Sequence, residues 1–107
     1  MSKINAKDLS IIDTINVTNY IKTASRTIAH PHVENDGSWI TMGWNTQGKR
    51  AHYEFIRYKS SKNANENTNM CDHAEVIGRI PSSHDKALSY FHSFGVTKNY
   101  IVFIEQP

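Results

Sequence analysis

The residues best suited to chemistry in this sequence are its histidines, at positions 30, 32, 52, 73, 84 and 92. Neutral imidazole is the commonest metal ligand in proteins. His30 and His32 flank Pro31, which lacks a backbone donor and favours an extended conformation at His30. On an extended chain the two rings share one face about 6.6 Å apart. Whether both could reach one metal depends on a kink, and a His-Pro-His is more often a turn or strand end.

The remaining histidines carry weaker signals. His92 lies between Phe91 and Phe94, and a histidine in such company is more often a hydrogen-bonded core residue than a ligand. His52 alternates with Glu54, which predicts a solvated face for both side chains. His73 and His84 border loops, and we assign them no role.

Composition excludes several other kinds of chemistry. Cys71 is the single cysteine of the 107 residues, so neither an internal disulfide nor a CxxC site exists. Neither a Gly-rich phosphate loop nor a GxSxG motif occurs. The formal net charge of +2 does not indicate nucleic-acid binding. The start lacks a signal-peptide pattern, and no apolar run reaches the roughly 18 residues of a membrane helix. We therefore expect a soluble, cytoplasmic protein.

Period-two hydrophobicity between turn residues predicts an all-β protein, an antiparallel meander with no helix longer than two turns. Asn35-Asp36-Gly37 is a strong hairpin signal just before one of the strands. The polar stretch 59–72 is predicted to be a loop, and 85–88 a short helical turn. The predicted strands cover residues 15–21, 38–44, 51–58, 73–80, 89–95 and 99–105.

Two motifs give these patterns a more specific meaning. The segments TIAHPHVENDGSWITMG (27–43) and SYFHSFGVTKNYIVFIEQP (89–107) together resemble the carotenoid cleavage oxygenase family. This family includes the carotenoid dioxygenases and the retinoid isomerase of the retinal pigment epithelium. The upstream segment DLSIIDTINVTNYI (8–21) is also similar, so the resemblance covers residues 8–107.

The resemblance implies a seven-bladed β-propeller whose axis holds iron(II) between four histidines. Residues 1–107 would form a partial propeller of about one and a half to two blades, a fragment of the catalytic domain. The first histidine of AHPH corresponds to His30 and the histidine of HSFG to His92, which makes these two the expected Fe²⁺ ligands. His32 would lie near the site without being a ligand. The other two ligands would lie outside this chain.

The resemblance also implies a reaction. Such an enzyme uses O₂ to split one double bond of a carotenoid or retinoid polyene, giving apocarotenal or retinal products. The 107-residue chain alone is expected to be inactive, and the full-length protein to associate peripherally with a membrane. One alternative is a retinoid isomerohydrolase of the same family. Two others are a metal-free carotenoid- or lipid-binding module and an independent zinc or iron site using His30 and His32 with His92 or His84.

Overall fold

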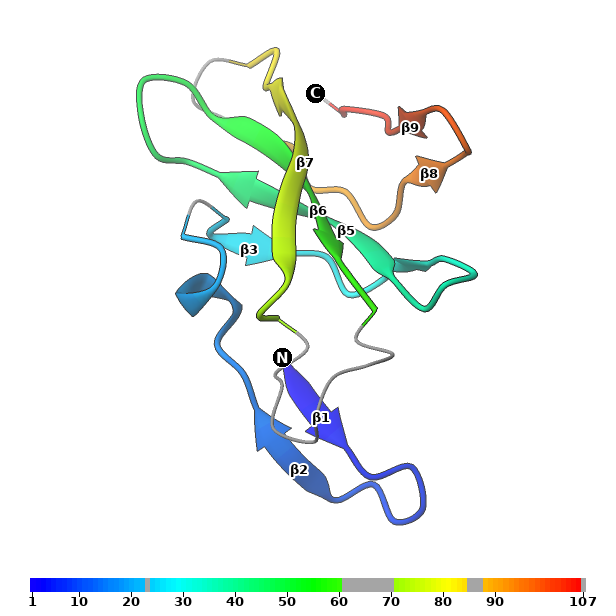
Figure 1. Ribbon diagram of the computed structural model, residues 1–107. Coiled ribbons are helices and arrows are strands. Elements are labelled where there is room, and N and C mark those ends of the chain that lie inside the picture. The colour runs from blue at the N-terminus through cyan, green and yellow to red at the C-terminus, as the bar shows by residue number, and fades with distance from the viewer. Residues whose placement is uncertain (23, 61–70, 85–87, 107) are drawn as a thin grey trace.

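The computed structural model describes residues 1–22, 24–60, 71–84 and 88–106, and it is built from antiparallel strands (Figure 1). Apart from strands, the described residues contain one 3₁₀ turn, η1 (Val17–Asn19). The all-β antiparallel prediction is therefore confirmed, whereas the assignment to propeller blades stays a prediction. Among the described residues, no helix has the length and apolar character needed to cross a membrane.

A five-stranded sheet forms the centre of the molecule. It contains β3 (Arg26–Thr27), β4 (His32–Val33), β5 (Trp39–Asn45), β6 (His52–Tyr58) and β7 (Ala74–Pro81). The order is β3-β5-β6-β7, and β4 pairs with the same edge of β5 as β3 does. The predicted strands at 38–44, 51–58 and 73–80 and the hairpin at Asn35-Asp36-Gly37 are thus confirmed. The register of β5 against β6 is regular, whereas that of β6 against β7 shifts between Phe55 and Ile56.

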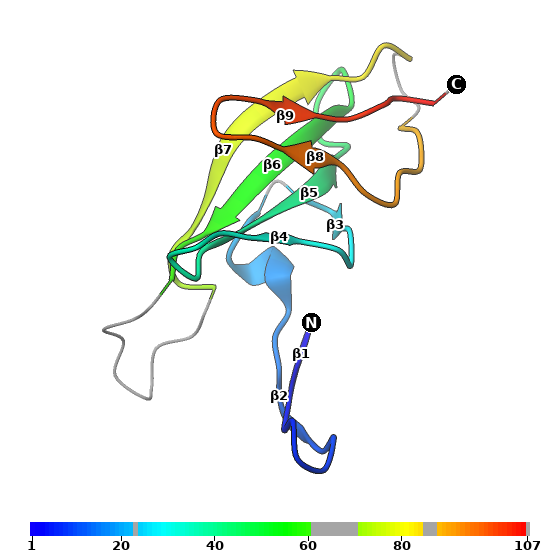
Figure 2. The same ribbon diagram turned by 90° about the vertical axis from the view of Figure 1, so that its right-hand side faces the viewer.

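Two short hairpins flank this sheet. β1 (Ser2–Ile4) and β2 (Ile11–Thr14) project from one end of it, and β8 (Gly95–Val96) and β9 (Ile101–Val102) lie over one of its faces (Figure 2). The face under β8 and β9 buries a cluster made of Ile40, Met42, Tyr53, Phe55, Phe91 and Phe94. The opposite face buries Ile15, Ile21, Ala24, Ile56, Tyr58 and Cys71. The central sheet is therefore covered on both faces.

Burial on both faces corrects one sequence-based prediction. Glu54 was expected on a solvated face, but its side chain is completely buried. Its Oε1 accepts hydrogen bonds from Asn45 Nδ2 at 2.9 Å and from Arg79 Nε at 2.8 Å. A buried carboxylate requires such charged and polar partners. His52, on the same side of β6, is half-buried rather than a surface residue.

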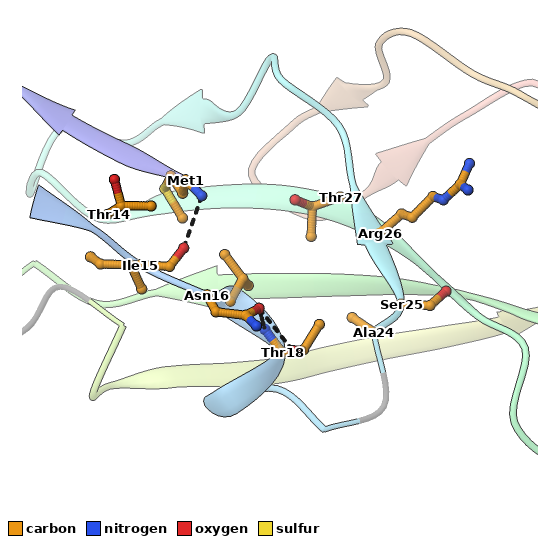
Figure 3. A pocket seen from close by; sticks show the side chains of 10 residues that line it. Met1, Thr14, Ile15, Asn16, Thr18, Ala24, Ser25, Arg26 and Thr27 are labelled. Atoms are coloured by element: carbon orange, nitrogen blue, oxygen red, sulfur yellow. Dashed lines mark hydrogen bonds between the residues drawn. The ribbon is translucent and has the colours of Figure 1, made fainter. Parts of the chain in front are cut away.

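The predicted strand at 15–21 is also wrong, because β2 ends before it and η1 replaces it. Asn16 caps the turn: its Oδ1 accepts from the backbone N–H of Thr18 at 3.2 Å and from the Thr18 hydroxyl at 2.8 Å (Figure 3). Such local side-chain bonds compete with a strand ladder. Ile15 and Ile21 are both buried at the ends of this turn, and their spacing imitates strand alternation.

The predicted strands at 89–95 and 99–105 shrink to β8 and β9. Phe91 and Phe94 enter the same cluster although they are three residues apart, which an extended strand does not allow. The segment between them is therefore not a strand, and its exposed side chains point outward. Most of the predicted loop at 59–72 and of the helical turn at 85–88 lies outside the described residues.

Candidate metal centre

The short link between β3 and β4 presents His30. Thr27 pairs with Gly43 and His32 pairs with Ile40, so this edge advances five residues while β5 advances three. The two extra residues cannot join the ladder, and the link bulges away from the sheet. His30 lies in this bulge with its side chain exposed.

Pro31 reinforces the bulge, because a proline has no N–H with which to resume pairing. Before the bulge, the N–H of Ile28 still donates to the Met42 carbonyl at 3.0 Å. Pairing with β5 is therefore intact on both sides of a short interruption. The sheet holds both ends of the link that carries His30.

Two buried phenylalanines position His92. Phe91 packs against Trp44 with ring centres 4.5 Å apart, and Phe94 packs against Phe55 at 6.1 Å. Each phenylalanine is only 6% exposed, whereas His92 between them is exposed. The two rings anchor the segment to β5 and β6 and leave the imidazole on its outer side.

The structure brings the rings of His30 and His92 together. Their centres lie 4.3 Å apart, and the ring planes are tilted by 47°. Two imidazoles that bind one metal through nitrogens about 2.1 Å away, at roughly 90° to each other, have centres about 4.6 Å apart. The observed centre distance is close to this value. The role of the two rings as ligands stays a prediction.

A tyrosine hydroxyl lies beside one ring nitrogen of His92. The hydroxyl of Tyr90 lies 3.3 Å from His92 Nδ1. When Nδ1 carries the proton and donates it to this oxygen, Nε2 keeps its lone pair. Metal-binding histidines commonly use their second nitrogen in this way, which fixes the tautomer and the ring orientation.

The other histidines do not join this pair as ligands. His32 approaches the carbonyl oxygen of Phe94 through Nε2, at 2.5 Å. His52 begins β6, His73 lies in the turn before β7, and His84 follows β7 next to Ser83, which bonds Glu105 of the second motif. Over the described ranges, no group of three or more His, Cys, Asp or Glu side chains could hold a metal ion. The alternative of an independent three-histidine site gains no support.

The chain is similar to one protein family and to several curated proteins over nearly its whole length. A family model described as the retinal pigment epithelial membrane protein matches residues 1–107. The β,β-carotene 15,15'-dioxygenase of Gallus gallus is 38% identical over 107 residues, which cover 98% of this chain and 20% of that protein. The mitochondrial carotenoid-cleaving dioxygenase of Macaca fascicularis is 36% identical over 107 residues, covering 100% of this chain and 19% of that protein.

The chain belongs to the carotenoid cleavage oxygenase family. It spans about a fifth of the length of the curated relatives it matches. The resemblance seen in the two motifs is confirmed, and the match extends over the whole chain.

In this family member, sequence reasoning missed the side chains that hold the C-terminal segment. The Tyr53 hydroxyl accepts from the backbone N–H of Ser89 at 2.9 Å and donates to Glu105 Oε1 at 2.8 Å. One buried residue of β6 thus holds both ends of the segment that carries His92. No motif signals this role, because the tyrosine occupies an ordinary strand position.

Glu105 accepts further hydrogen bonds from the end of β7. Its carboxylate accepts hydrogen bonds from the Ser83 hydroxyl at 2.5 Å and from the Ser82 hydroxyl at 2.8 Å. The Ser83 hydroxyl, with smaller help from Ser82 and Tyr53, lowers the pKa of Glu105 from 4.5 to about 2. The ionised carboxylate is thus the form that anchors the chain after β9.

Two cavities adjoin Tyr90, and one of them also adjoins His92, whereas His30 lines neither. His92 lines a cavity of about 510 Å³ together with Phe103 and Ile104, and Tyr90 lines both this cavity and another of about 750 Å³ beside Trp44. A third cavity, of about 450 Å³, lies next to β1 and β3 (Figure 3) and contains neither histidine of the pair. The apolar space near the candidate metal centre is therefore around Tyr90 and His92.

Proposed function

We propose that this chain supplies His30 and His92 as two ligands of an iron(II) centre in an enzyme that cleaves a carotenoid double bond with O₂. One observation carries the proposal: two motifs 62 residues apart place their imidazoles 4.3 Å apart, the spacing of two ligands on one metal. Imidazole is a suitable ligand for iron. The family relationship supplies the reaction class.

The described donor set is incomplete for such a centre. Structural and catalytic zinc sites use at least three protein ligands, whereas the described residues bring two histidines together. We infer that the remaining imidazoles come from parts of the protein outside these 107 residues. The isolated chain would then bind metal weakly and would not turn over substrate.

Iron(II) would supply the activation of dioxygen beside the polyene. The chain's own contribution would be to aim His30 from the bulge, to aim His92 from its phenylalanine anchors, and to line the approach with apolar side chains. Tyr90 is 72% exposed and Ile104 is 77% exposed, next to the cavity that His92 lines. Exposed apolar surface of this kind suits a carotenoid, which has almost no polar groups.

Oxidative cleavage is favoured over retinoid isomerisation because the relatives from Gallus gallus and Macaca fascicularis are both named as dioxygenases. The retinoid isomerohydrolase alternative shares the same iron ligands, so the histidine pair does not distinguish the two. A metal-free carotenoid- or lipid-binding module would not need the two imidazoles to converge.

A chimaeric enzyme tests the proposal. The matching segment of the Gallus gallus relative would be replaced by this chain, and the iron-loaded chimaera assayed for cleavage of β,β-carotene. We expect cleavage, and we expect His30→Ala or His92→Ala to abolish it while His73→Ala retains it. His73 is an exposed histidine in the turn before β7 and controls for the loss of any imidazole. A folded, iron-loaded chimaera that stays inactive, or that remains active without His30, would contradict the proposal.

A further inference from the structure

A second contact joins the two motifs beside the histidine pair. His32 follows His30 by two residues, and Phe94 follows His92 by two residues. The Nε2 atom of His32 lies 2.5 Å from the carbonyl oxygen of Phe94, and the two rings meet edge to face with centres 4.7 Å apart. The segment around His30 and the segment around His92 are therefore joined by two contacts, His30 with His92 and His32 with Phe94.

The two residues in this contact differ in the backbone pairing of their segments. His32 belongs to β4 and is paired with Ile40 of β5, so its backbone is part of the central sheet. Phe94 belongs to the non-strand segment, and its ring is buried in the cluster under β8 and β9. The hydrogen bond thus ties a segment without ladder pairing to a strand that has it.

The chemistry of the contact assigns the proton. A carbonyl oxygen only accepts hydrogen bonds, so His32 Nε2 must carry a hydrogen and donate it. This nitrogen then has no lone pair for a metal. His32 is therefore not an Nε2 ligand, even though it lies close to His30 in the sequence.

We propose that His32 is a positioning residue, whose Nε2–H holds the Phe94 carbonyl and thereby fixes the His92 ring against His30. This inference rests on the proposed metal site. The packing of Phe91 and Phe94 and the Tyr53–Ser89 hydrogen bond hold the segment against the sheet. The His32 bond adds a restraint on the backbone only two residues after His92, and so on the direction of its imidazole. Partners that orient metal ligands typically change metal affinity by 10- to 100-fold.

The test separates the hydrogen bond from the packing. His32→Phe keeps an aromatic ring against Phe94 but has no donor, whereas His32→Gln keeps an N–H at a similar reach. Affinity for Co²⁺ would be measured by absorption titration of the metal-free chimaera described above, at a temperature where circular dichroism shows each variant folded. We expect His32→Phe to bind Co²⁺ about tenfold more weakly and His32→Gln to stay within about threefold of the parent. A merely structural role would change the unfolding midpoint and leave affinity in the folded state unchanged.

Three further variants make each outcome decisive. His32→Asn, whose amide is too short to reach the carbonyl, answers the same question if the phenylalanine variant does not fold. His30→Ala and His92→Ala test the metal site itself. If these two bind Co²⁺ like the parent, the proposed site fails. If they lose binding while folded His32→Phe or His32→Asn keeps the parent affinity, the site stands and the positioning role of His32 is overturned.

A spectroscopic signature gives an independent readout. Long-range ¹H–¹⁵N correlation spectra distinguish the two tautomers of a neutral imidazole. We expect His32 to show a protonated Nε2 both before and after diamagnetic Zn²⁺ is added, while the resonances of His30 and His92 shift. An unprotonated Nε2 at His32 would overturn the assignment.

Discussion

Replacing Phe91 or Phe94 with leucine tests how the segment around His92 is built. Each ring is 6% exposed and lies in the same cluster. A phenylalanine buries roughly 150–250 Å², which at about 25 cal/mol per Å² corresponds to about 4–6 kcal/mol. Truncation to alanine costs about 3–5 kcal/mol, a large part of the total stability of a small domain. Leucine retains much of the volume, so we expect a loss of about 1–1.5 kcal/mol at each position.

The assay is urea unfolding followed by tryptophan fluorescence, since Trp44 packs directly on Phe91. Tyr100→Leu serves as the control, because Tyr100 is 71% exposed and its replacement should change stability by less than about 0.5 kcal/mol. If residues 91–94 formed a strand, the two phenylalanines would lie on opposite faces, and one substitution would resemble the control. A loss below about 0.5 kcal/mol at either position would refute the structure of this segment.

Three further predictions concern the supports of the site. Because the pKa of Glu105 falls from 4.5 to about 2 on folding, its ionised form stabilises the C-terminal segment above pH 4.5, and this contribution should disappear as the pH falls toward 2. Gly43→Ala should destabilise the chain by about 1–3 kcal/mol, because a Cβ atom there would lie 2.7 Å from the Arg26 carbonyl oxygen and disturb the β3–β5 pairing. Tyr90→Phe should weaken Co²⁺ binding severalfold, because His92 Nδ1 loses its hydroxyl partner.

Each of these predictions has a matched control. Glu105→Gln should flatten the acid-dependent loss of stability in urea unfolding, and an unchanged pH profile would contradict the assigned anchor. Gly78→Ala places a Cβ atom at an ordinary 3.5 Å from Phe55, so its unfolding midpoint should shift less than that of Gly43→Ala. Tyr100→Phe removes the hydroxyl of another exposed tyrosine, and equal affinities of the two tyrosine variants would argue against the Tyr90 contact.

The candidate site was predictable from motifs rather than from strand patterns. The AHPH and HSFG motifs identified His30 and His92, and the structure brings the two rings together. The bulge that presents His30 could not be read from the sequence, because it follows from how β3 and β4 share one edge of β5. Pro31 was the single local signal for it.

The errors in the fold prediction have a common physical cause. Period-two patterns show which side chains are solvated only where one face of a sheet meets solvent, and the central sheet is buried on both faces. Glu54 therefore looked exposed, although Asn45 and Arg79 satisfy it inside. Around His92, aromatic residues suggested β-structure, whereas the spacing of Phe91 and Phe94 indicates a segment anchored on one side. Tertiary contacts decided both cases, and local sequence does not encode them.

The most direct test of this account is a double-mutant cycle for Co²⁺ binding with His30→Ala, His92→Ala and the double variant. If both imidazoles bind one ion, each single variant should lose at least tenfold in affinity. The double variant should then be little worse than either single one, because the site is already broken. Independent, additive losses, or an affinity that neither substitution changes, would show that the two rings do not share a metal and would contradict the central claim.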